Sequence, residues 1–286
     1  MPADASRSPG LPDVDELGVP ADRAGREAYV RSMFDRIAHR YDLLNRLLSF
    51  GQDVLWRKAA ARMAVVPGVH RVLDVAAGTG DLAREVLRRL GPGGRVVAVD
   101  FAPGMMRLAR SKLEAAGAGR ARVVGANALA LPFRDKSFDA SVMGFAARNV
   151  ADLRACFQEM GRVVRPGGRV VCLELSHPVG RVWGRLYRWY FYRVVPLVGG
   201  LVLGRRGPYD YLPRSLTSFP TQEVLARVME EAGLREVRYV NLLGGIAALH
   251  VGQVPAHPGS ATAPPARRQQ ARPEAACVEG SVARRR

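Results

Sequence analysis

The sequence predicts an α/β fold in which helices cover both faces of a mostly parallel sheet. Short apolar segments alternate with segments of helical period between residues 71 and 175. The first apolar segment, 72–75, runs into a turn of small residues and then a helix over 81–90. The next, 95–100, ends in a carboxylate about 20 residues beyond that turn. Strand, turn, helix and acid in this order are typical of a nucleotide-binding βαβ unit.

The helices and strands before and after this unit are predicted from the spacing of apolar residues and from residues that begin or end helices. Apolar residues at three- and four-residue steps predict one or two helices over 29–48, and Asp53 is expected to cap the next helix. Asp81 is likewise expected at an N-cap, and Pro103 suits a first helical turn. The remaining helices begin at Asp152 and after Thr221. Strands are predicted over 72–75, 95–100, 121–124, 137–143, 169–175, 236–242 and 247–251.

Composition predicts one domain with disordered ends. The chain has 286 residues and is 48% hydrophobic, which is ample for a packed core. Residues 1–26 and 254–286 lack apolar period and are expected to be a disordered leader and a disordered basic tail, leaving one domain over 27–253. The 3 cysteines show no CxxC spacing, which argues against a disulfide framework and favours the cytoplasm. No apolar run is long enough to cross a bilayer.

The net charge of +17 indicates an anionic partner, either nucleic acid or an acidic membrane surface. Part of the excess lies in the tail, and no basic and aromatic motif suited to bases accompanies it. We therefore expect no nucleic acid, and an RNA-binding protein is kept as the non-enzyme alternative.

A helical insertion is predicted at about 178–206, where arginines and aromatic residues are interleaved without a single acid. Such a belt suits a membrane interface, and it could also cover a large apolar ligand. An inserted helical pair packed on the core is an equally weighted interpretation.

The turn at 76–80 does not match the dinucleotide pattern GxGxxG. Asp81 would repel a phosphate, whereas a carboxylate attracts an ammonium or sulfonium group. These features suit a cationic nucleoside without phosphates, of which S-adenosylmethionine is an example. Asp100 would then bind the ribose hydroxyls, and Asn127 with Ala128 would lie beside adenine.

The chain resembles the class I S-adenosylmethionine-dependent methyltransferases and, within them, the ubiquinone/menaquinone biosynthesis C-methyltransferase family. The segments Tyr41-Asp-Leu-Leu-Asn45 and Arg148-Asn-Val150 are specific to that family, whereas the glycine turn indicates only the superfamily. Further matching segments lie at 33–40, 48–53, 56–58, 74–81, 100–101, 127–128, 165–168, 173–176, 211–212 and 219–220.

The resemblance implies a Rossmann-like fold with a seven-stranded, mostly parallel sheet and an N-terminal helical cap. It also implies S-adenosylmethionine as cofactor and no metal. One departure is Gly144, since relatives often carry a serine that contacts the cofactor at this position. The cofactor-binding residues expected from the resemblance and the turn are Ala76, Gly78, Thr79, Gly80, Asp81, Asp100, Phe101, Asn127, Ala128 and Gly144.

The family reaction transfers the methyl group to a ring carbon of a polyprenyl hydroquinone. Arg148 is expected to organise a base water or stabilise a phenolate, because a guanidinium cannot accept a proton at neutral pH. Asn149 and Tyr41 are expected to orient the ring hydroxyls. Substrate contacts are expected from the polar residues His39, Asp42, Asn45 and Tyr211.

The resemblance leaves the substrate ring open. Demethylmenaquinol is favoured over a benzoquinol, and methylation of another hydrophobic small molecule is an alternative. The polyprenyl tail implies peripheral contact with the inner face of the cell membrane, and a homodimer is a further expectation. His250, late in the last predicted strand, is interpreted as structural rather than catalytic.

Overall fold

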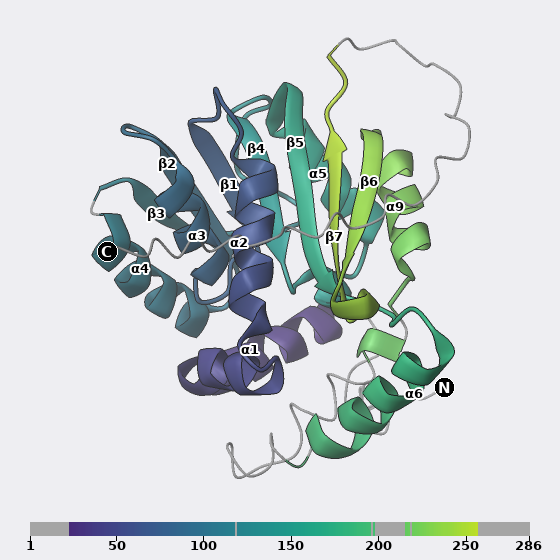
Figure 1. Cartoon of the computed structure of the whole chain (residues 1–286). Helices are drawn as coiled ribbons and strands as arrows, with labels where there is room; N and C mark the ends of the chain where they lie inside the picture. The colour runs from purple at the N-terminus through teal and green to yellow at the C-terminus, as the bar shows by residue number, and fades with distance from the viewer. Residues whose placement is uncertain (1–22, 118, 196, 198–214, 218, 257–286) are drawn as a thin grey trace, which may run out of the picture. The chain divides into compact units, whose positions relative to one another are not determined.

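A seven-stranded sheet with the order β3-β2-β1-β4-β5-β7-β6 forms the centre of the protein (Figure 1). The computed structural model describes residues 23–117, 119–195, 197, 215–217 and 219–256. β7 is antiparallel to both of its neighbours, and the other pairs are parallel, which confirms the predicted sheet. The strands are β1 Arg71–Val75, β2 Arg95–Asp100, β3 Ala121–Gly125, β4 Phe138–Gly144, β5 Val164–Leu175, β6 Arg235–Leu242 and β7 Ala247–Gln253.

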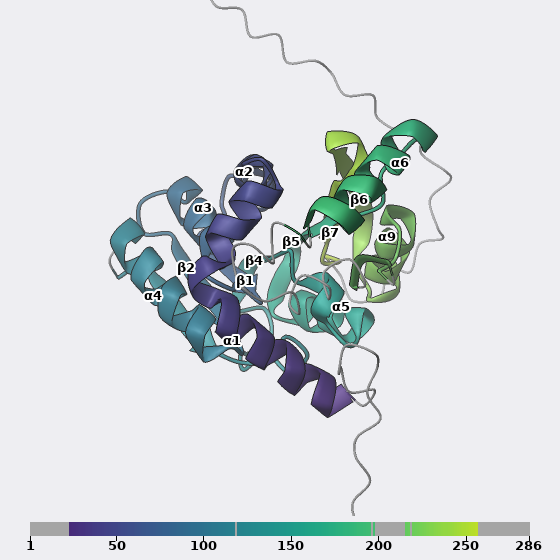
Figure 2. The same cartoon turned by 90° about the horizontal axis from the view of Figure 1, so that it is seen from below.

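Helices cover both faces of this sheet, as predicted. α2, α3 and α4 lie on one face, and α5 and α9 lie on the other (Figures 1 and 2). Because helices cover both faces, the central strands are almost continuously apolar, and Leu73, Val142 and Leu173 are fully buried. The helices are α1 Arg23–Leu48, α2 Gln52–Ala64, α3 Asp81–Arg89, α4 Pro103–Gly117, α5 Leu153–Arg162, α6 Arg181–Trp189 and α9 Gln222–Glu231.

α1 is one continuous helix that begins at Arg23, so residues 23–26 of the expected leader are helical. It lies below the sheet, across the edge where the parallel strands end (Figure 1). Asp35 holds α1 to the start of α4, because its Oδ1 accepts a 2.6 Å hydrogen bond from the amide of Gly104. Residues 254–256 continue beyond β7, and the rest of the predicted tail lies outside the described residues.

Two of the predicted helix caps, Asp53 and Asp81, are wrong, and the cap predicted at Thr221 is confirmed. Gly51 and Gly80 occupy the N-cap positions of α2 and α3 with φ values of 75° and 82°, so Asp53 and Asp81 lie inside the first helical turn. Glycine replaces an Asp cap there because the left-handed backbone favours a residue without Cβ. At α9 the side chain of Thr221 accepts a hydrogen bond from the amide of Val224. Asp152, predicted as the first residue of its helix, is the N-cap of α5 and accepts a hydrogen bond from the amide of Ala155.

Candidate cofactor and substrate site

Two adjoining cavities lie at the carboxyl ends of the strands. The first is bounded by the ends of β1, β2 and β4 and by α1, which places it where doubly wound folds bind ligands. The second lies between α1, α2 and the insertion that contains α6. Arg57 and Phe145 line both cavities and therefore mark the junction between them.

The turn after β1 brings backbone to the wall of the first cavity. Ala76, Gly78 and Gly80 have φ values of 53°, 56° and 82°, and the amide of Ala77 donates a 2.8 Å hydrogen bond to the carbonyl of Val99 in β2. A Cβ added at Gly80 would lie 3.2 Å from the backbone of α4. The turn therefore requires small residues both for its conformation and for its packing.

Asp100 joins the end of β2 to this turn. Its Oδ2 accepts a 2.7 Å hydrogen bond from the amide of Gly78, and its Oδ1 accepts a 2.9 Å bond from the amide of Ala102. Burial raises the pKa of this carboxyl group, and the backbone donors oppose that shift. Each oxygen retains a second acceptor position, which is the capacity that two ribose hydroxyls require.

Asp74, at the end of β1, is a site residue that our sequence analysis noted only as part of a motif. It is fully buried, and neither carboxyl oxygen accepts a hydrogen bond from the described residues. Burial raises its pKa to about 8, an effect only partly offset by the backbone amide of Ala83, which is near but not within hydrogen-bond geometry, and by the charge of Arg57. A buried carboxyl group without hydrogen bonds at the wall of a cavity is suited to a donor or cation from a ligand.

An ion network connects α1 to the same turn. The hydroxyl of Thr79 donates a 2.6 Å hydrogen bond to Asp42 of α1, and the ammonium of Lys112 contacts both Asp42 and Asp81, the latter at 2.9 Å. Burial acts to raise the pKa of Asp81, but Lys112 and the nearby arginines hold it below its usual value. Asp81 thus already contacts an ammonium group, the kind of ligand predicted for it.

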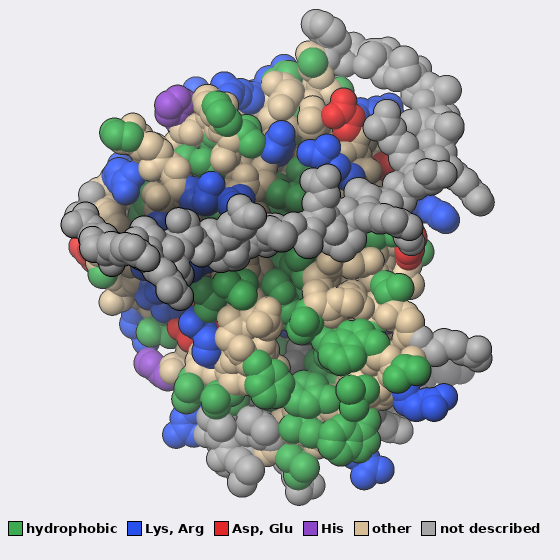
Figure 3. Space-filling model, viewed as in Figure 1, with side chains coloured by type: hydrophobic (Ala, Val, Ile, Leu, Met, Phe, Trp, Pro, Cys, Tyr) green, Lys and Arg blue, Asp and Glu red, His purple; other side chains and the backbone are tan. Residues whose placement is uncertain are grey.

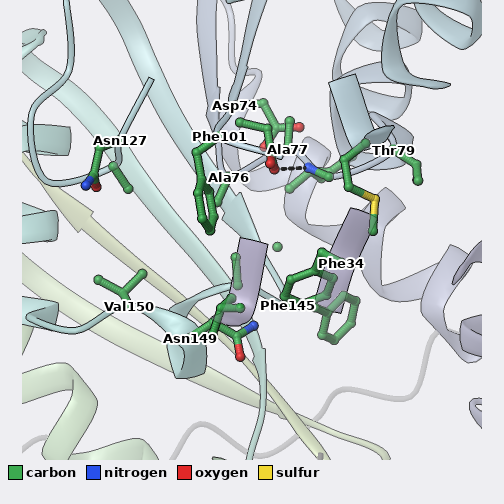
Figure 4. A pocket seen from close by; sticks show the side chains of 18 of the residues that line it. Phe34, Asp74, Ala76, Ala77, Thr79, Phe101, Asn127, Phe145, Asn149 and Val150 are labelled. Atoms are coloured by element: carbon green, nitrogen blue, oxygen red, sulfur yellow. Dashed lines mark hydrogen bonds between the residues drawn. The ribbon is translucent and has the colours of Figure 1, made fainter. Parts of the chain in front are cut away.

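Asn127 lies across the cavity from Thr79, with the ring of Phe101 between them (Figure 4). Its Oδ1 accepts a 3.0 Å hydrogen bond from the amide of Leu129, which orients the side chain. Gly144 lines the same cavity, and a Cβ there would lie 3.0 Å from Leu82, so α3 leaves little room for the serine common in relatives. Ala128 also lines this cavity.

The second cavity has mostly apolar and aromatic walls. Trp56 and Phe145 are in ring contact, with centroids 6.1 Å apart, beside the junction with the first cavity. Phe50 contacts Tyr190 on the far side. Other rings that line this cavity come from the insertion and are those of Trp183, Tyr187, Trp189 and Phe191.

The predicted catalytic residues lie on both sides of the junction. Arg148 lines the second cavity, pairs with the buried Glu174 and donates a 2.9 Å hydrogen bond to the carbonyl of Phe145. Asn149 and Tyr41 line the first cavity. The Oδ1 atom of Asn149 is buried and has no hydrogen-bond partner among the described residues.

The predicted substrate residues are not all brought together. Asn45 lines the second cavity, and its buried Nδ2 has no hydrogen-bond partner among the described residues. His39 is exposed on α1 and lines neither cavity. Tyr211 lies outside the described residues. His250 is buried in β7, contacts the carbonyl of Gln222 at 2.9 Å and lines neither cavity, in keeping with a structural role.

Sequence reasoning assigned no role in a site to Asp53, Arg57, Asp74, Lys112 or Glu174, although all of them except Lys112 lie in segments that match the family. Asp53 and Arg57 have i,i+4 spacing in a predicted helix, which is a usable signal for an ion pair. The spacing gives no indication that this pair faces a cavity, and Glu174 of β5 pairs with Arg148 in the short helical turn after β4, 26 residues away in the chain.

The doubly wound sheet and the glycine turn with its carboxylates define an S-adenosylmethionine-dependent methyltransferase. The sequence model of the ubiE/COQ5 methyltransferase family matches residues 23–254, and the chain belongs to this family. It is accordingly an S-adenosylmethionine-dependent C-methyltransferase, as the sequence resemblance implied.

Relatives match nearly their whole length. The chain is 50% identical to the demethylmenaquinone methyltransferase of Thermus thermophilus, over 78% of this chain and 100% of the relative. It is 46% identical to the enzyme of the same name from Deinococcus radiodurans, over 81% and 95% of the two chains. The ubiquinone/menaquinone biosynthesis C-methyltransferase UbiE of Geobacter sulfurreducens is 44% identical, over 78% of this chain and 88% of that relative.

Solved structures with low identity share the fold. A methyltransferase from Aquifex aeolicus matches with a TM-score of 0.51 at 18% identity, over 69% of this chain and 89% of that chain. The [4+2]-cyclase SpnF matches with a TM-score of 0.58 at 16% identity, over 88% and 100%. Because a cyclase has this fold, the fold alone does not specify the reaction.

Proposed function

We propose that this enzyme methylates a ring carbon of a polyprenyl quinol and that the preferred substrate is demethylmenaquinol. The observation that carries the proposal is the aromatic second cavity, which meets the cofactor cavity at Phe145 and Arg57. A flat apolar ring in the second cavity would lie beside the cofactor. The naphthoquinol ring is favoured because relatives at 46% and 50% identity are named demethylmenaquinone methyltransferases.

The first cavity fits S-adenosylmethionine in the chemistry of its side chains. Asp100 would bind the ribose hydroxyls, Asp81 the ammonium group, and Asn127 with Ala128 the adenine. When bound, the cofactor supplies a methyl group on a positively charged sulfur. Asp74, whose oxygens accept no hydrogen bond from the described residues, places a titratable carboxyl group at the wall of this cavity, where it would attract a positively charged ligand.

Polar groups at the junction would orient and activate the ring. Asn45 has a free donor and Asn149 a free acceptor among the described residues, and they line the second and first cavities respectively. Arg148, held rigidly by Glu174, would stabilise negative charge on a ring oxygen. Tyr41, packed edge to face against Phe34, would limit how the ring lies.

We also propose that α6 and the residues after it contact an anionic membrane on its cytoplasmic face. Val182, Leu186 and Trp189 of α6 are 84%, 54% and 60% exposed. Hydrophobic side chains gather at lower right in Figure 3, where Figure 1 shows α6. Arg185 and Arg188 are exposed on the same helix. Among the described residues, no helix is long and apolar enough to cross a bilayer. An exposed apolar helix beside the second cavity would let a polyprenyl tail stay in lipid.

The proposed reaction is tested with S-adenosylmethionine labelled in its methyl group. We expect label in the ring of demethylmenaquinol and less in the benzoquinol analogue. An Asp100→Ala variant should lose cofactor binding and labelling together, which controls for contaminating activity. Label only in the benzoquinol would show that the substrate is a benzoquinol rather than demethylmenaquinol. No label in either quinol would contradict quinol methylation and favour another hydrophobic small molecule as methyl acceptor.

A further inference from the structure

We propose that Asp53 is the catalytic base that accepts the proton of the ring hydroxyl, with Arg57 as its compensating cation. The inference rests on the quinol methylation proposed above. Among the described residues that line the second cavity, Asp53 is the one carboxylate. It is 3% exposed, so bulk water has little access to it.

The local contacts orient both oxygens of Asp53. Its Oδ2 pairs with Arg57 one helical turn further along α2. Its Oδ1 accepts a 3.0 Å hydrogen bond from the hydroxyl of Ser49 and lies 3.3 Å from Nε of Arg46 on α1. Three neighbouring groups from α1, α2 and the loop between them therefore hold the carboxylate at the cavity wall, and Oδ2, which has one of these partners, keeps acceptor capacity for a ring hydroxyl.

Arg57 connects this carboxylate to the reaction centre. It lines both cavities, and its Cζ lies 5.1 Å from the centroid of the Phe145 ring at their junction. It is only 6% exposed, so its charge is weakly screened by water. A phenolate that forms at the junction would therefore be stabilised by the same cation that now stabilises Asp53.

This arrangement lowers the cost of proton transfer. The negative charge would move from Asp53 to a ring oxygen within one cavity, where Arg57 and Arg148 remain as counter-ions. No new buried charge is created, so the desolvation penalty for an isolated buried anion does not arise.

Other groups near the cavity are less suited to the task. Arg148 cannot accept a proton, and its partner Glu174 lines neither cavity. The hydroxyls of Tyr187 and Tyr190 share the cavity, but burial raises the pKa of both, so they remain neutral donors. The carboxylates that line the first cavity do not line the second cavity, in which the ring is placed.

The proposed step balances as follows. The O–H bond of the ring hydroxyl breaks, the proton moves to Asp53, and the electron pair enters the ring and makes the adjacent carbon nucleophilic. This carbon forms the new bond to the methyl group, and the electron pair of the broken S–C bond stays on sulfur. The methylated ring then loses its C–H proton to water and takes a proton back from Asp53 on oxygen, so one proton is released overall.

The opposing explanation is that Asp53 and Arg57 only stabilise the start of α2. Asp53→Asn keeps the size of the side chain, whereas Asp53→Glu keeps the base but displaces it. A catalytic base predicts that Asn lowers kcat by about 10²–10⁴-fold and that Glu retains more activity than Asn. A structural role predicts the reverse order. Glu85→Gln is the matched control, because Glu85 is also buried in a helical ion pair, with Arg88, and lines neither cavity.

Two further readouts separate chemistry from folding. In Asp53→Asn, the Kd for S-adenosylmethionine should stay within about twofold, and kcat should rise with pH towards the pKa of the quinol hydroxyl.

Wild-type kcat with an unchanged pH profile in Asp53→Asn would overturn the role of Asp53. If the wild-type enzyme methylates no quinol, the proposed function fails instead, and the two failures are thereby distinguished.

Discussion

Asp74 couples the charge of the cofactor cavity to pH. Its pKa is raised to about 8 mainly by burial, so the carboxyl group is neutral at lower pH. A raised acid pKa means that the folded protein holds a proton that the unfolded chain releases. The free energy of unfolding that Asp74 contributes therefore falls as pH rises from the ordinary pKa of an aspartate, 3.8, through about 8.

The same linkage predicts how the affinity for S-adenosylmethionine depends on pH. A cationic ligand near Asp74 favours the ionised carboxylate, so binding should release a proton below pH 8. We expect affinity to rise with pH, by up to about tenfold per unit, and to level off above about pH 8. Calorimetry in buffers with different ionisation enthalpies measures the released proton, and Asp74→Asn should release none. Equal affinities at about pH 6 and pH 8 would contradict this coupling.

The buried pair of Arg148 and Glu174 should contribute strongly to stability. The two side chains are 7% and 1% exposed, and Glu174 also accepts a hydrogen bond from the amide of Arg148. Glu174→Gln leaves a buried guanidinium without its counter-ion, so we expect the free energy of unfolding to fall by about 3 kcal/mol.

Urea denaturation measures this loss. Asp135→Asn is the control, because Asp135 pairs with Arg162 but its side chain is 67% exposed. That substitution should cost at most about 1 kcal/mol. Similar losses in the two variants would argue against a special contribution from the buried pair.

At the scale of elements, α1 is tied to the cofactor turn by side chains. Asp42 contacts Thr79 and Lys112, and Asp35 binds the start of α4. α1 also supplies Val30, Phe34 and Tyr41 to the wall of the first cavity. Contacts between α1 and the turn should therefore slow the escape of bound cofactor.

Asp42→Asn removes the charge that pairs with Lys112 and leaves Lys112 bound to Asp81 alone. We expect the dissociation rate of S-adenosylmethionine to rise several-fold, with a smaller change in the association rate, in stopped-flow fluorescence. Arg36→Gln changes an exposed residue of the same helix whose guanidinium donates a 3.0 Å hydrogen bond to the hydroxyl of Ser32, and it should leave both rates unchanged. An equal effect of the two substitutions would show that the contacts of Asp42 with Thr79 and Lys112 do not specifically retain the cofactor.

At the scale of the whole molecule, the exposed face of α6 should determine membrane binding. Joint replacement of Trp183, Arg188 and Trp189 by alanine removes two large apolar groups and one charge. We expect sedimentation with anionic liposomes to weaken by more than about tenfold, while the affinity for S-adenosylmethionine is retained. Val224→Ala alters an exposed apolar residue of α9 and serves as the control. Unchanged liposome binding in the triple variant would contradict the membrane proposal.

The sequence alone was sufficient for the fold class and the cofactor turn, because both depend on local patterns. Strand and helix periods follow from which side chains are apolar, and the turn follows from small residues at 76–80. The family followed from segments such as Tyr41 to Asn45, which are short and specific. Helix starts were less predictable, because Asp53 and Asp81 use their carboxylates for ion pairs while glycines occupy the caps.

Only the tertiary structure decided which polar residues meet at the junction of the two cavities. Asp53 and Arg57 look like an ordinary helical ion pair in the sequence, and His39 looks as suitable for a site as Asn45. Their roles differ because the crossing of α1 and α2 beside β4 turns Asn45 towards a cavity and leaves His39 exposed. Such placement depends on contacts between residues far apart in the chain, and no local period or propensity encodes it.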